Sequence, residues 1–383
     1  MAYNRKQRLN DNIKAIETAF ILDREQRTPT ARERLLLERY CGFGGLKCIL
    51  NPARELADAV HWAKSDLELF APTVELHRLI RENSKNESEY KQLMDSLKQS
   101  VLTAFYTPSA VTEALTDVLK EHQIIPEKVL EPSAGIGAFV DSVLDNNPKA
   151  DIMAFEKDLL TGKILRHLHP EQKVRIEGFE KIEKPFNDYF DLAISNIPFG
   201  DVAVFDPSYT AMKGMRALVT RRIHNYFFVK ALDTVRDGGL VAFITSQGVL
   251  NAKNNSAARF MMLYHADLVS AIRLPNNLFT ENANTEVGSD LIILQKNSQK
   301  ESLRGDDNLL DTVYNDENRI PTNNYFLEHP ERIIHTTAKL DTDPFGKPAM
   351  IYTHEDGVEG IAEELRKMLN EDFGRNFHVY GQN

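Results

Sequence analysis

Apolar residues in the first hundred positions recur at helical spacing. A helix is expected over residues 10–21, and a second runs from Thr30 to Tyr40, with Glu33 at the capping-box position. The glycine-rich residues 41–45 end the second helix, and a charged helix is expected over residues 87–99. The apolar positions of the first helix are Ile13, Ile16, Phe20 and Ile21. Residues 1–100 are therefore predicted to form a helical N-terminal region.

Between residues 101 and 297, short apolar runs of strand length alternate with helical stretches. This alternation is typical of a mainly parallel, doubly wound sheet, which places ligands at the carboxyl ends of its strands. A helix is expected to begin at Ala138 and another to cover 226–235. Expected strands cover 129–130, 152–155, 190–195, 240–245, 268–274 and 290–295. The predicted fold class is α/β, a Rossmann-like sheet with helices on both faces.

Residues 298–383 are polar, with one helix expected over 359–369, and are predicted to form an acidic C-terminal extension. Residues 301–383 hold 8 Lys and Arg against 17 Asp and Glu, which accounts for most of the net charge of −10. The rest of the chain is nearly neutral and can hold a local basic cleft. The charge therefore excludes only a protein that coats nucleic acid indiscriminately.

Composition also bounds the compartment. No apolar run approaches the ~20 residues that span a bilayer, and the first residues lack the apolar core of a signal peptide. A cytoplasmic location without a membrane partner is expected. Cys41 and Cys48 are expected to be ordinary thiols, because no further Cys or His pair has zinc-ligand spacing, and no metal is predicted.

A glycine turn after the strand at 129–130 is the first chemical signal. Its two glycines let the backbone approach a ligand closely, although such a turn alone is weak evidence. A dinucleotide site has a third small residue where Val140 stands here, whereas Glu131 suits a positively charged ligand. Further on, a strand ends at Glu156, which places a carboxylate for ribose hydroxyls. Together these features favour a nucleoside ligand without phosphates, and S-adenosylmethionine fits that description.

Residues 104–109 precede another helix. Pro108 stands near the helix start, where its fixed φ is favourable, and Thr107 or Ser109 is expected to cap the helix. Spacing alone explains these residues as a plain cap as well as it explains them as part of a ligand site.

Residues 191–200 are the most specific segment, an apolar strand that ends in an amide, a proline-stiffened turn and an aromatic residue. The lone pair of an aromatic amine is delocalised into its ring, so two acceptors that take both amine protons direct it toward a methyl donor. Asn196 Oδ1 and the Ile197 carbonyl supply two acceptors, Pro198 stiffens the loop, and Phe199 offers a stacking face for an extruded base. An ordinary strand-to-loop turn is the competing interpretation.

This segment resembles the Asn-Pro-Pro-Tyr/Phe motif of N6-adenine DNA methyltransferases. The order of a Thr-Pro motif, a glycine motif and the Asn motif is that of the gamma class, and the resemblance covers about residues 101–297. It implies a methyltransferase sheet with S-adenosyl-L-methionine as cofactor and double-stranded, adenine-containing DNA as substrate. The catalytic residues that it implies are Asn196, Ile197, Pro198 and Phe199. The cofactor-binding residues that it implies are Tyr106, Thr107, Pro108, Glu131, Pro132, Ser133, Ala134, Gly135, Gly137, Glu156, Lys157 and Asn196.

Two further stretches, residues 225–244 and 271–279, also resemble the gamma class, and the second is similar to the region after the central sheet in modification subunits of type I restriction systems. Residues 39–46, with 196–200 and 224–228, are similar to the methylase region of large helicase–methylase proteins of conjugative elements and phages. A helicase domain or subunit is thus an expected partner, because this sequence contains no GxxxxGK[ST] loop. The resemblance implies DNA methylation in a restriction-modification or mobile-element setting.

Two departures from the family pattern bear on the site. Ile197 stands where the first proline usually stands. The acceptor there is a backbone carbonyl, so the chemistry survives, but the loop is expected to be less rigid and the activity weaker. The Asp that binds the cofactor adenine in the family is missing, and Glu177 and Glu180 are both candidates to replace it.

Other functions stay open at this point. RNA and protein-glutamine methyltransferases also use Asn-Pro-Pro-Tyr/Phe loops, but their small members lack the Tyr-Thr-Pro motif and long flanking regions. Ile197 and the missing Asp favour a weakly active module that binds S-adenosylmethionine or DNA inside a larger helicase machine. Val140 disfavours a nicotinamide dehydrogenase.

The DNA contacts are less defined than the catalytic loop. Phe279 is a candidate to pack on a flipped base, although core packing is its commoner fate. The residues that suit either phosphate contacts or a solvated basic surface are Lys213, Arg216, Arg221 and Arg222.

Overall fold

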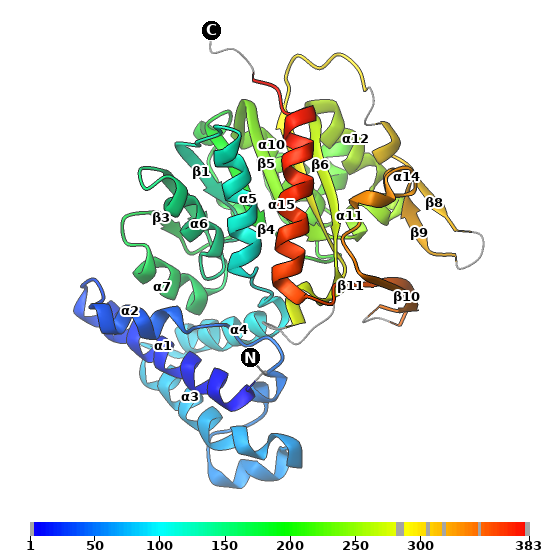
Figure 1. The fold of residues 1–383 in the computed structure, drawn as a ribbon. Coiled ribbons are helices and arrows are strands. Elements are labelled where there is room, and N and C mark those ends of the chain that lie inside the picture. Colours follow the sequence, from blue (N-terminus) through cyan, green and yellow to red (C-terminus); the bar gives the residue numbers. More distant parts are fainter. Residues whose placement is uncertain (1–3, 281–286, 304–306, 316–318, 344–345, 380–383) are drawn as a thin grey trace.

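A helical N-terminal region lies beneath a central sheet that is covered by helices (Figure 1). The computed structural model describes residues 4–280, 287–303, 307–315, 319–343 and 346–379. The capping box predicted at Thr30 and Glu33 is confirmed. The N-terminal elements are α1 (Arg5–Glu25), α2 (Ala31–Glu38), η1 (Lys47–Leu50), η2 (Leu56–His61), η3 (Lys64–Leu69), α3 (Phe70–Glu82) and α4 (Glu87–Thr103).

Among the described residues, seven strands form one sheet in the order β3-β2-β1-β4-β5-β7-β6. Neighbouring strands pair in parallel, except that β7 runs antiparallel to β5 and β6. The strands are β1 (Lys128–Glu131), β2 (Asp151–Phe155), β3 (Lys173–Arg175), β4 (Phe190–Asn196), β5 (Val235–Ser246), β6 (Ala266–Leu274) and β7 (Ser289–Lys296). The strand order reverses between β1 and β4, so their carboxyl ends frame the crevice where such a sheet binds ligands.

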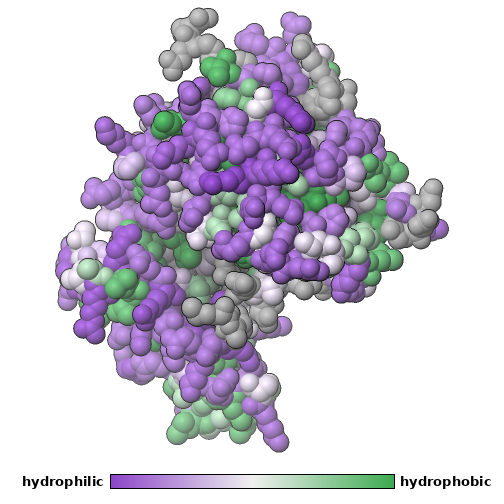
Figure 2. All heavy atoms as spheres, viewed as in Figure 1, coloured by the Kyte–Doolittle hydropathy of each residue, from purple (hydrophilic) through white to green (hydrophobic). Residues whose placement is uncertain are grey.

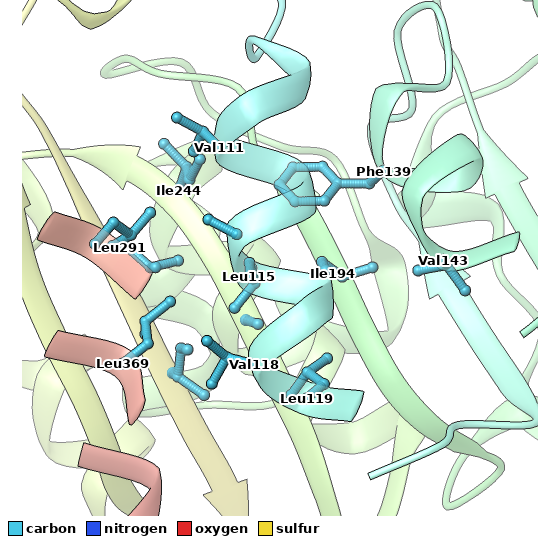
Figure 3. Packing of buried hydrophobic residues seen from close by; sticks show 14 of the residues in the cluster. Val111, Leu115, Val118, Leu119, Phe139, Val143, Ile194, Ile244, Leu291 and Leu369 are labelled. Carbon is cyan, nitrogen blue, oxygen red and sulfur yellow. The ribbon is translucent and has the colours of Figure 1, made fainter. Parts of the chain in front are cut away.

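Both faces of the sheet are buried by helices. Apolar side chains alternate along the strands, so that Ile194 of β4 faces one side and Ala193 faces the other. The first side packs on α5 and α6, and Figure 3 shows Val111 and Leu115 of α5 over the sheet. The second side packs on α10 and α12. The helices that connect the strands are α5 (Ser109–Glu121), α6 (Ala138–Asn146), α7 (Leu159–Leu168), α8 (Pro207–Thr210), α9 (Met215–Val219), α10 (Ile223–Thr234), α11 (Gly248–Asn251) and α12 (Ser256–His265), and the 3₁₀ helices are η4 (Phe179–Lys181), η5 (Lys184–Phe186), η6 (Lys253–Asn255) and η7 (Asn276–Phe279). The predicted fold class is confirmed.

The C-terminal segment contributes to the same core. Helix α15 (Gly357–Asn376) runs beside α5, and its apolar stripe joins the core on that face (Figures 1 and 3). The stripe consists of Ile361, Leu365, Leu369 and Phe373. The sequence predicted an extension over 298–383, part of which lies outside the described residues. The high overall polarity of this segment concealed the apolar stripe of α15. A single apolar stripe is enough to pack a helix against a core.

Strand β5 begins earlier than expected. It pairs with β4 from Val235 onward, whereas the sequence predicted a helix through that residue and a strand only from Leu240. A register shift between Phe190 and Leu192 accommodates the residues between Val235 and Leu240, where Gly238 has φ +75°. Helix α10 therefore ends at Thr234, and the glycines lie within the strand.

The remaining described elements are short. They are η8 (Asp307–Leu309), β8 (Thr312–Tyr314), β9 (Pro321–Asn323), α14 (Asn324–Glu328), η9 (Pro330–Arg332), β10 (Thr337–Thr342) and β11 (Pro348–Thr353). The face that carries α15 is largely hydrophilic, with hydrophobic groups at the lower end of the N-terminal region (Figure 2). Within the described ranges, every helix is too short or too polar to cross a membrane.

Candidate active site

The glycine turn after β1 is shaped by backbone contacts and two left-handed glycines. Ala134 N–H donates to the Phe155 carbonyl of β2 at 2.9 Å, and Gly137 N–H donates to the Ala134 carbonyl at 2.8 Å. Gly135 has φ +56° and Gly137 has φ +90°, conformations that residues with a Cβ rarely adopt. The turn thus places backbone without side chains at the carboxyl edge of the sheet.

The two glycines face different neighbours. A Cβ on Gly135 would lie 2.9 Å from Cε1 of Tyr106, whose ring covers this part of the turn. A Cβ on Gly137 would lie 2.8 Å from Leu165 of α7. Gly135 therefore brings the Tyr-Thr-Pro segment onto the turn, while Gly137 allows close packing between α6 and α7. Pro132 is buried next to them, before Ser133.

Two carboxylates border the turn. Glu131, 1% exposed, accepts a hydrogen bond from Ser133 N–H at 3.0 Å, and burial raises its pKa to about 8. Glu156 follows β2 and accepts hydrogen bonds from the N–H groups of Gly135 and Asp158, each at 2.8 Å. Desolvation and the nearby Asp158 carboxylate raise the pKa of Glu156 to about 7. Cationic groups or hydroxyl donors from a ligand would compensate both buried acids.

The Tyr-Thr-Pro segment does not cap α5 as predicted. Pro108 is the N-cap residue, and the cap makes no side-chain hydrogen bond. Thr107 is 6% exposed, and its hydroxyl has no hydrogen-bond partner among the described residues. A buried hydroxyl without a partner is costly, so this atom is suited to a ligand at the crevice.

Asn196, at the end of β4, is tied to that same segment. Its Nδ2 donates to the Phe105 carbonyl at 2.7 Å. A carbonyl can only accept, so the amide orientation is fixed by chemistry and Oδ1 is left as the group available for other partners. The sequence suggested an acceptor at Asn196, but the role of Phe105 in orienting it was missed.

Ile197 is anchored more firmly than expected. Its side chain is 1% exposed in the core on the α10 face. Its N–H donates to the Ile244 carbonyl of β5 at 3.0 Å, a bond that proline cannot make. Isoleucine therefore supplies two anchors in place of a proline ring.

An aromatic cluster backs the loop. Phe199 is partly exposed and lies edge-on to Phe279, with ring centroids 6.5 Å apart. Phe279 is fully buried and also contacts Phe105 at a centroid distance of 6.3 Å. Phe279 is thus a core residue that supports Phe199. Pro198, which precedes Phe199 in the loop, is partly exposed.

The structure separates the two candidates for the missing acid. Glu177 is paired with Arg175 at 2.5 Å, and the same guanidinium is also paired with Glu183. Glu180, with its side chain 19% exposed, lies 4.0 Å from Lys157, which follows Glu156. The Lys157 side chain itself is 80% exposed. Glu180 is therefore the candidate that lies beside Lys157, whereas Glu177 lies beside Arg175.

The basic residues after the loop fall into two pairs. Arg216 bonds both carboxylate oxygens of Asp233, and Arg222 is paired with Asp201 at 2.8 Å. Lys213 and Arg221 are exposed, and in the described part of the chain neither makes an ion pair. Of these four cations, Lys213 and Arg221 are therefore the two that are available for an external anion.

The residues present fit a nucleoside cofactor with a positively charged end. The two acids, the Thr107 hydroxyl without a partner in the described structure and the glycine turn all lie at or next to the carboxyl ends of β1, β2 and β4. The strand order with one antiparallel strand, the glycine turn after β1 and the acid after β2 define the class, an S-adenosylmethionine-dependent methyltransferase fold.

The comparison with protein families gives the narrower assignment. Residues 88–353 match the N-6 DNA Methylase family, and the chain belongs to that family. Over 201 residues, or 51% of the chain, it is 29% identical to Defense against restriction protein B of Escherichia phage P1. Over 173 residues, or 42% of the chain, it is 25% identical to Type II methyltransferase M.XamI of Xanthomonas campestris pv. amaranthicola. These matches span 8% and 33% of the two relatives.

The solved structures that are similar to this chain include one described as a modification subunit of a type I restriction enzyme from Vibrio vulnificus YJ016. The two chains are 16% identical and superpose with a TM-score of 0.44. The alignment covers 76% of this chain and 67% of the other.

Proposed function

We propose that this protein transfers a methyl group from S-adenosyl-L-methionine to the N6 amine of an adenine in DNA. The observation that carries the proposal is the orientation of Asn196, whose Nδ2 is held by the Phe105 carbonyl so that Oδ1 is left to accept. The family match and the buried acids around the glycine turn support the same assignment.

The chemistry follows from the electronic structure of the adenine amine. Bound S-adenosylmethionine supplies an electrophilic methyl group on a sulfonium. Asn196 Oδ1 and the Ile197 carbonyl accept hydrogen bonds from the two N6–H groups, which draws the nitrogen lone pair out of the ring. Transfer would form the N6–carbon bond as the methyl–sulfur bond breaks, the sulfur would leave as a neutral thioether, and the methylated N6 would release one proton to water. Phe199 offers a face on which an extruded adenine stacks.

The residues around the turn are assigned by their chemistry. Glu131 suits the ammonium of the methionine end, and the Thr107 hydroxyl can bond the same end. Glu156 suits the ribose hydroxyls, because each of its carboxylate oxygens accepts one backbone N–H and keeps a lone pair for a hydroxyl donor. Glu180 is proposed to replace the missing Asp at the cofactor adenine, because Glu177 is engaged by Arg175.

The proposed partners are DNA and a helicase domain or subunit. The helicase proposal rests on the similarity of residues 39–46 and 196–200 to helicase–methylase proteins. It is compatible with the small share of the two relatives that the chain spans.

The proposal is tested with labelled S-adenosylmethionine and separate DNA, RNA and protein substrates, each with wild type and Asn196→Ala. We expect label in DNA, identified as N6-methyladenine by mass spectrometry, and loss of it in the variant. Label in RNA or protein instead would reject the DNA assignment. Cofactor binding without transfer to any substrate would indicate a binding module.

A further inference from the structure

The N-terminal helical region shares its core with the cofactor side of the sheet. Leu160, Ile164 and Leu168 of α7 belong to the same hydrophobic cluster as the buried residues of α1 to α4. Ile136, between the two glycines of the turn, also packs against this cluster. The region is therefore continuous with the wall of the crevice.

A polar network ties this region to the acid after β2. Asp158 caps α7 and accepts hydrogen bonds from the hydroxyls of Ser96, on α4, and Thr161. The Tyr40 hydroxyl is 3.0 Å from the Thr161 hydroxyl. The Asp158 N–H in turn donates to Glu156 at 2.8 Å. Residues from two N-terminal segments thus hold the stretch that carries the proposed ribose-binding acid.

The glycine-rich residues 41–45 are clamped from α1. The fully buried Asn12 donates from Nδ2 to the Gly42 carbonyl at 2.7 Å and accepts from the Cys41 N–H at 2.9 Å. The Phe43 N–H donates to the Ser100 hydroxyl of α4 at 3.1 Å. Buried side-chain amides that satisfy backbone groups in this way fix a loop in one conformation.

Gly42 touches the residue that covers the cofactor turn. It has φ +67°, and a Cβ there would lie 2.9 Å from the Tyr106 hydroxyl and 2.7 Å from Ala104 Cβ. The Tyr106 ring lies in the same way against Gly135. Gly42, Tyr106 and Gly135 are therefore stacked in that order, without room for an additional methyl group at either glycine.

We propose that residues 41–45, held by Asn12, form the back wall of the cofactor site by keeping Tyr106 against Gly135. The N-terminal region then acts in binding S-adenosylmethionine through two positioning residues. Gly42 acts through Tyr106, and Tyr40 acts through Thr161 and Asp158 on Glu156. This inference rests on the proposed function, because it takes the ligand of the turn to be S-adenosylmethionine.

The test compares Gly42→Ala with Gly346→Ala. Gly346 also has a left-handed φ, +78°, but a Cβ added there would meet no atom of the described residues within 4 Å. Both changes carry similar backbone strain. We expect the dissociation constant for S-adenosylmethionine, measured by calorimetry, to rise about tenfold or more in Gly42→Ala and to stay unchanged in Gly346→Ala. The KM for the cofactor should rise with little change in kcat.

Tyr40→Phe serves as the second variant, since it removes one hydroxyl and keeps the shape of a buried ring. Loss of its bond to Thr161 should weaken cofactor binding about threefold or more. If Gly42→Ala does not fold, as judged by circular dichroism, the cofactor affinity of Tyr40→Phe becomes the deciding measurement. The inference is overturned if the folded variants bind the cofactor within about twofold of wild type. Wild-type protein that does not bind S-adenosylmethionine would instead overturn the proposed function.

Discussion

The two loops that meet between β1 and β4 are held in different ways. The glycine turn after β1 depends on two left-handed glycines and on Tyr106, which packs onto it from another segment. The loop after β4 starts from Ile197, whose side chain is in the core and whose backbone continues the pairing with β5. The first loop is shaped by its neighbours, whereas the second is an extension of the sheet.

This difference suits two tasks. A binding turn must expose backbone to its ligand, so it has few side chains of its own to stabilise it. A catalytic loop must keep its acceptors in place, so it benefits from anchors that do not depend on the ligand. Changes in the first loop should therefore alter cofactor affinity, and changes in the second should alter the rate of transfer.

The largest expected effect is that of Asn196→Ala. Removal of a preorganised polar group at the reacting atom should lower kcat by about 10²–10³-fold. The cofactor dissociation constant should change far less, because the glycine turn is untouched. Asn196→Asp keeps an acceptor but loses the donor to Phe105, so its kcat should be intermediate. Single-turnover kinetics and calorimetry measure the two quantities, and an equal loss of both would break the contrast between the loops.

Gly135→Ala should have the opposite pattern, with weaker cofactor binding and little change in the rate of transfer. The added methyl group meets the Tyr106 ring and enforces a left-handed φ on alanine. Strain of about 1–3 kcal/mol corresponds to a cofactor dissociation constant raised roughly 5- to 150-fold. Transfer at saturating cofactor should stay near the wild-type rate. A variant that binds normally and transfers slowly would assign the turn to catalysis instead.

The buried Glu131 predicts a pH dependence of cofactor binding. Its pKa of about 8 means that unliganded protein holds this proton at pH 7. A cationic ligand end favours the ionised form, so affinity should rise with pH from 6 to 8, by at most about tenfold per unit, and then level off. Glu131→Gln should remove this rise. Calorimetry in buffers of different ionisation enthalpy detects the released proton, and wild-type affinity that is flat over this range would contradict the assignment.

The raised pKa of Glu131 also makes stability depend on pH. The direction of this dependence is opposite to that of an ion-paired acid, whose pKa is lowered. Between the usual glutamate pKa of 4.5 and about 8, the folded protein binds the proton that the unfolded chain releases. Glu131 should therefore make the free energy of unfolding fall as pH rises through this interval, and its own contribution is at most about 1.4 kcal/mol per unit. Glu156 adds to the slope up to about pH 7, so Glu131→Gln should remove only part of it. Urea unfolding at several pH values measures the slope.

A smaller effect is expected from Ile197→Pro, which introduces the residue that related loops carry. It removes the hydrogen bond to Ile244 and empties a buried site, so the free energy of unfolding should fall by about 1–3 kcal/mol. The kcat should stay within about threefold, because the carbonyl acceptor remains. A large gain in kcat would show that isoleucine limits the loop after all.

The smallest effect is expected beyond the second loop. Lys213→Ala with Arg221→Ala removes the two exposed cations that lack ion pairs in the described part of the chain. DNA affinity should fall a few-fold, with a salt dependence lowered by about one unit per residue, while cofactor binding stays unchanged. The matched pair Arg216→Ala with Arg222→Ala should mainly lower stability, since both are engaged by aspartates. Fluorescence anisotropy over a salt series measures the slope.

Much of the fold could be predicted from the sequence. The strands that end at Glu131 and Asn196, and the strand that Glu156 follows, are short apolar runs closed by a polar residue, and local periodicity is enough to recognise them. The helix cap at Thr30 also depends only on residues three apart. The prediction of a cap by Thr107 or Ser109 was wrong, because Pro108 takes that position and leaves the Thr107 hydroxyl without a partner in the described structure.

The sequence by itself determined the strand–helix alternation, the glycine turn and the acceptors of the Asn196 loop, because each rests on neighbouring residues. Only the tertiary structure decided which way Asn196 faces, that Glu180 rather than Glu177 lies beside Lys157, and that α15 completes the core. It also placed Gly42 behind Tyr106. These contacts join residues from different elements across the sheet, and their formation depends on packing and burial of the whole chain rather than on local pattern.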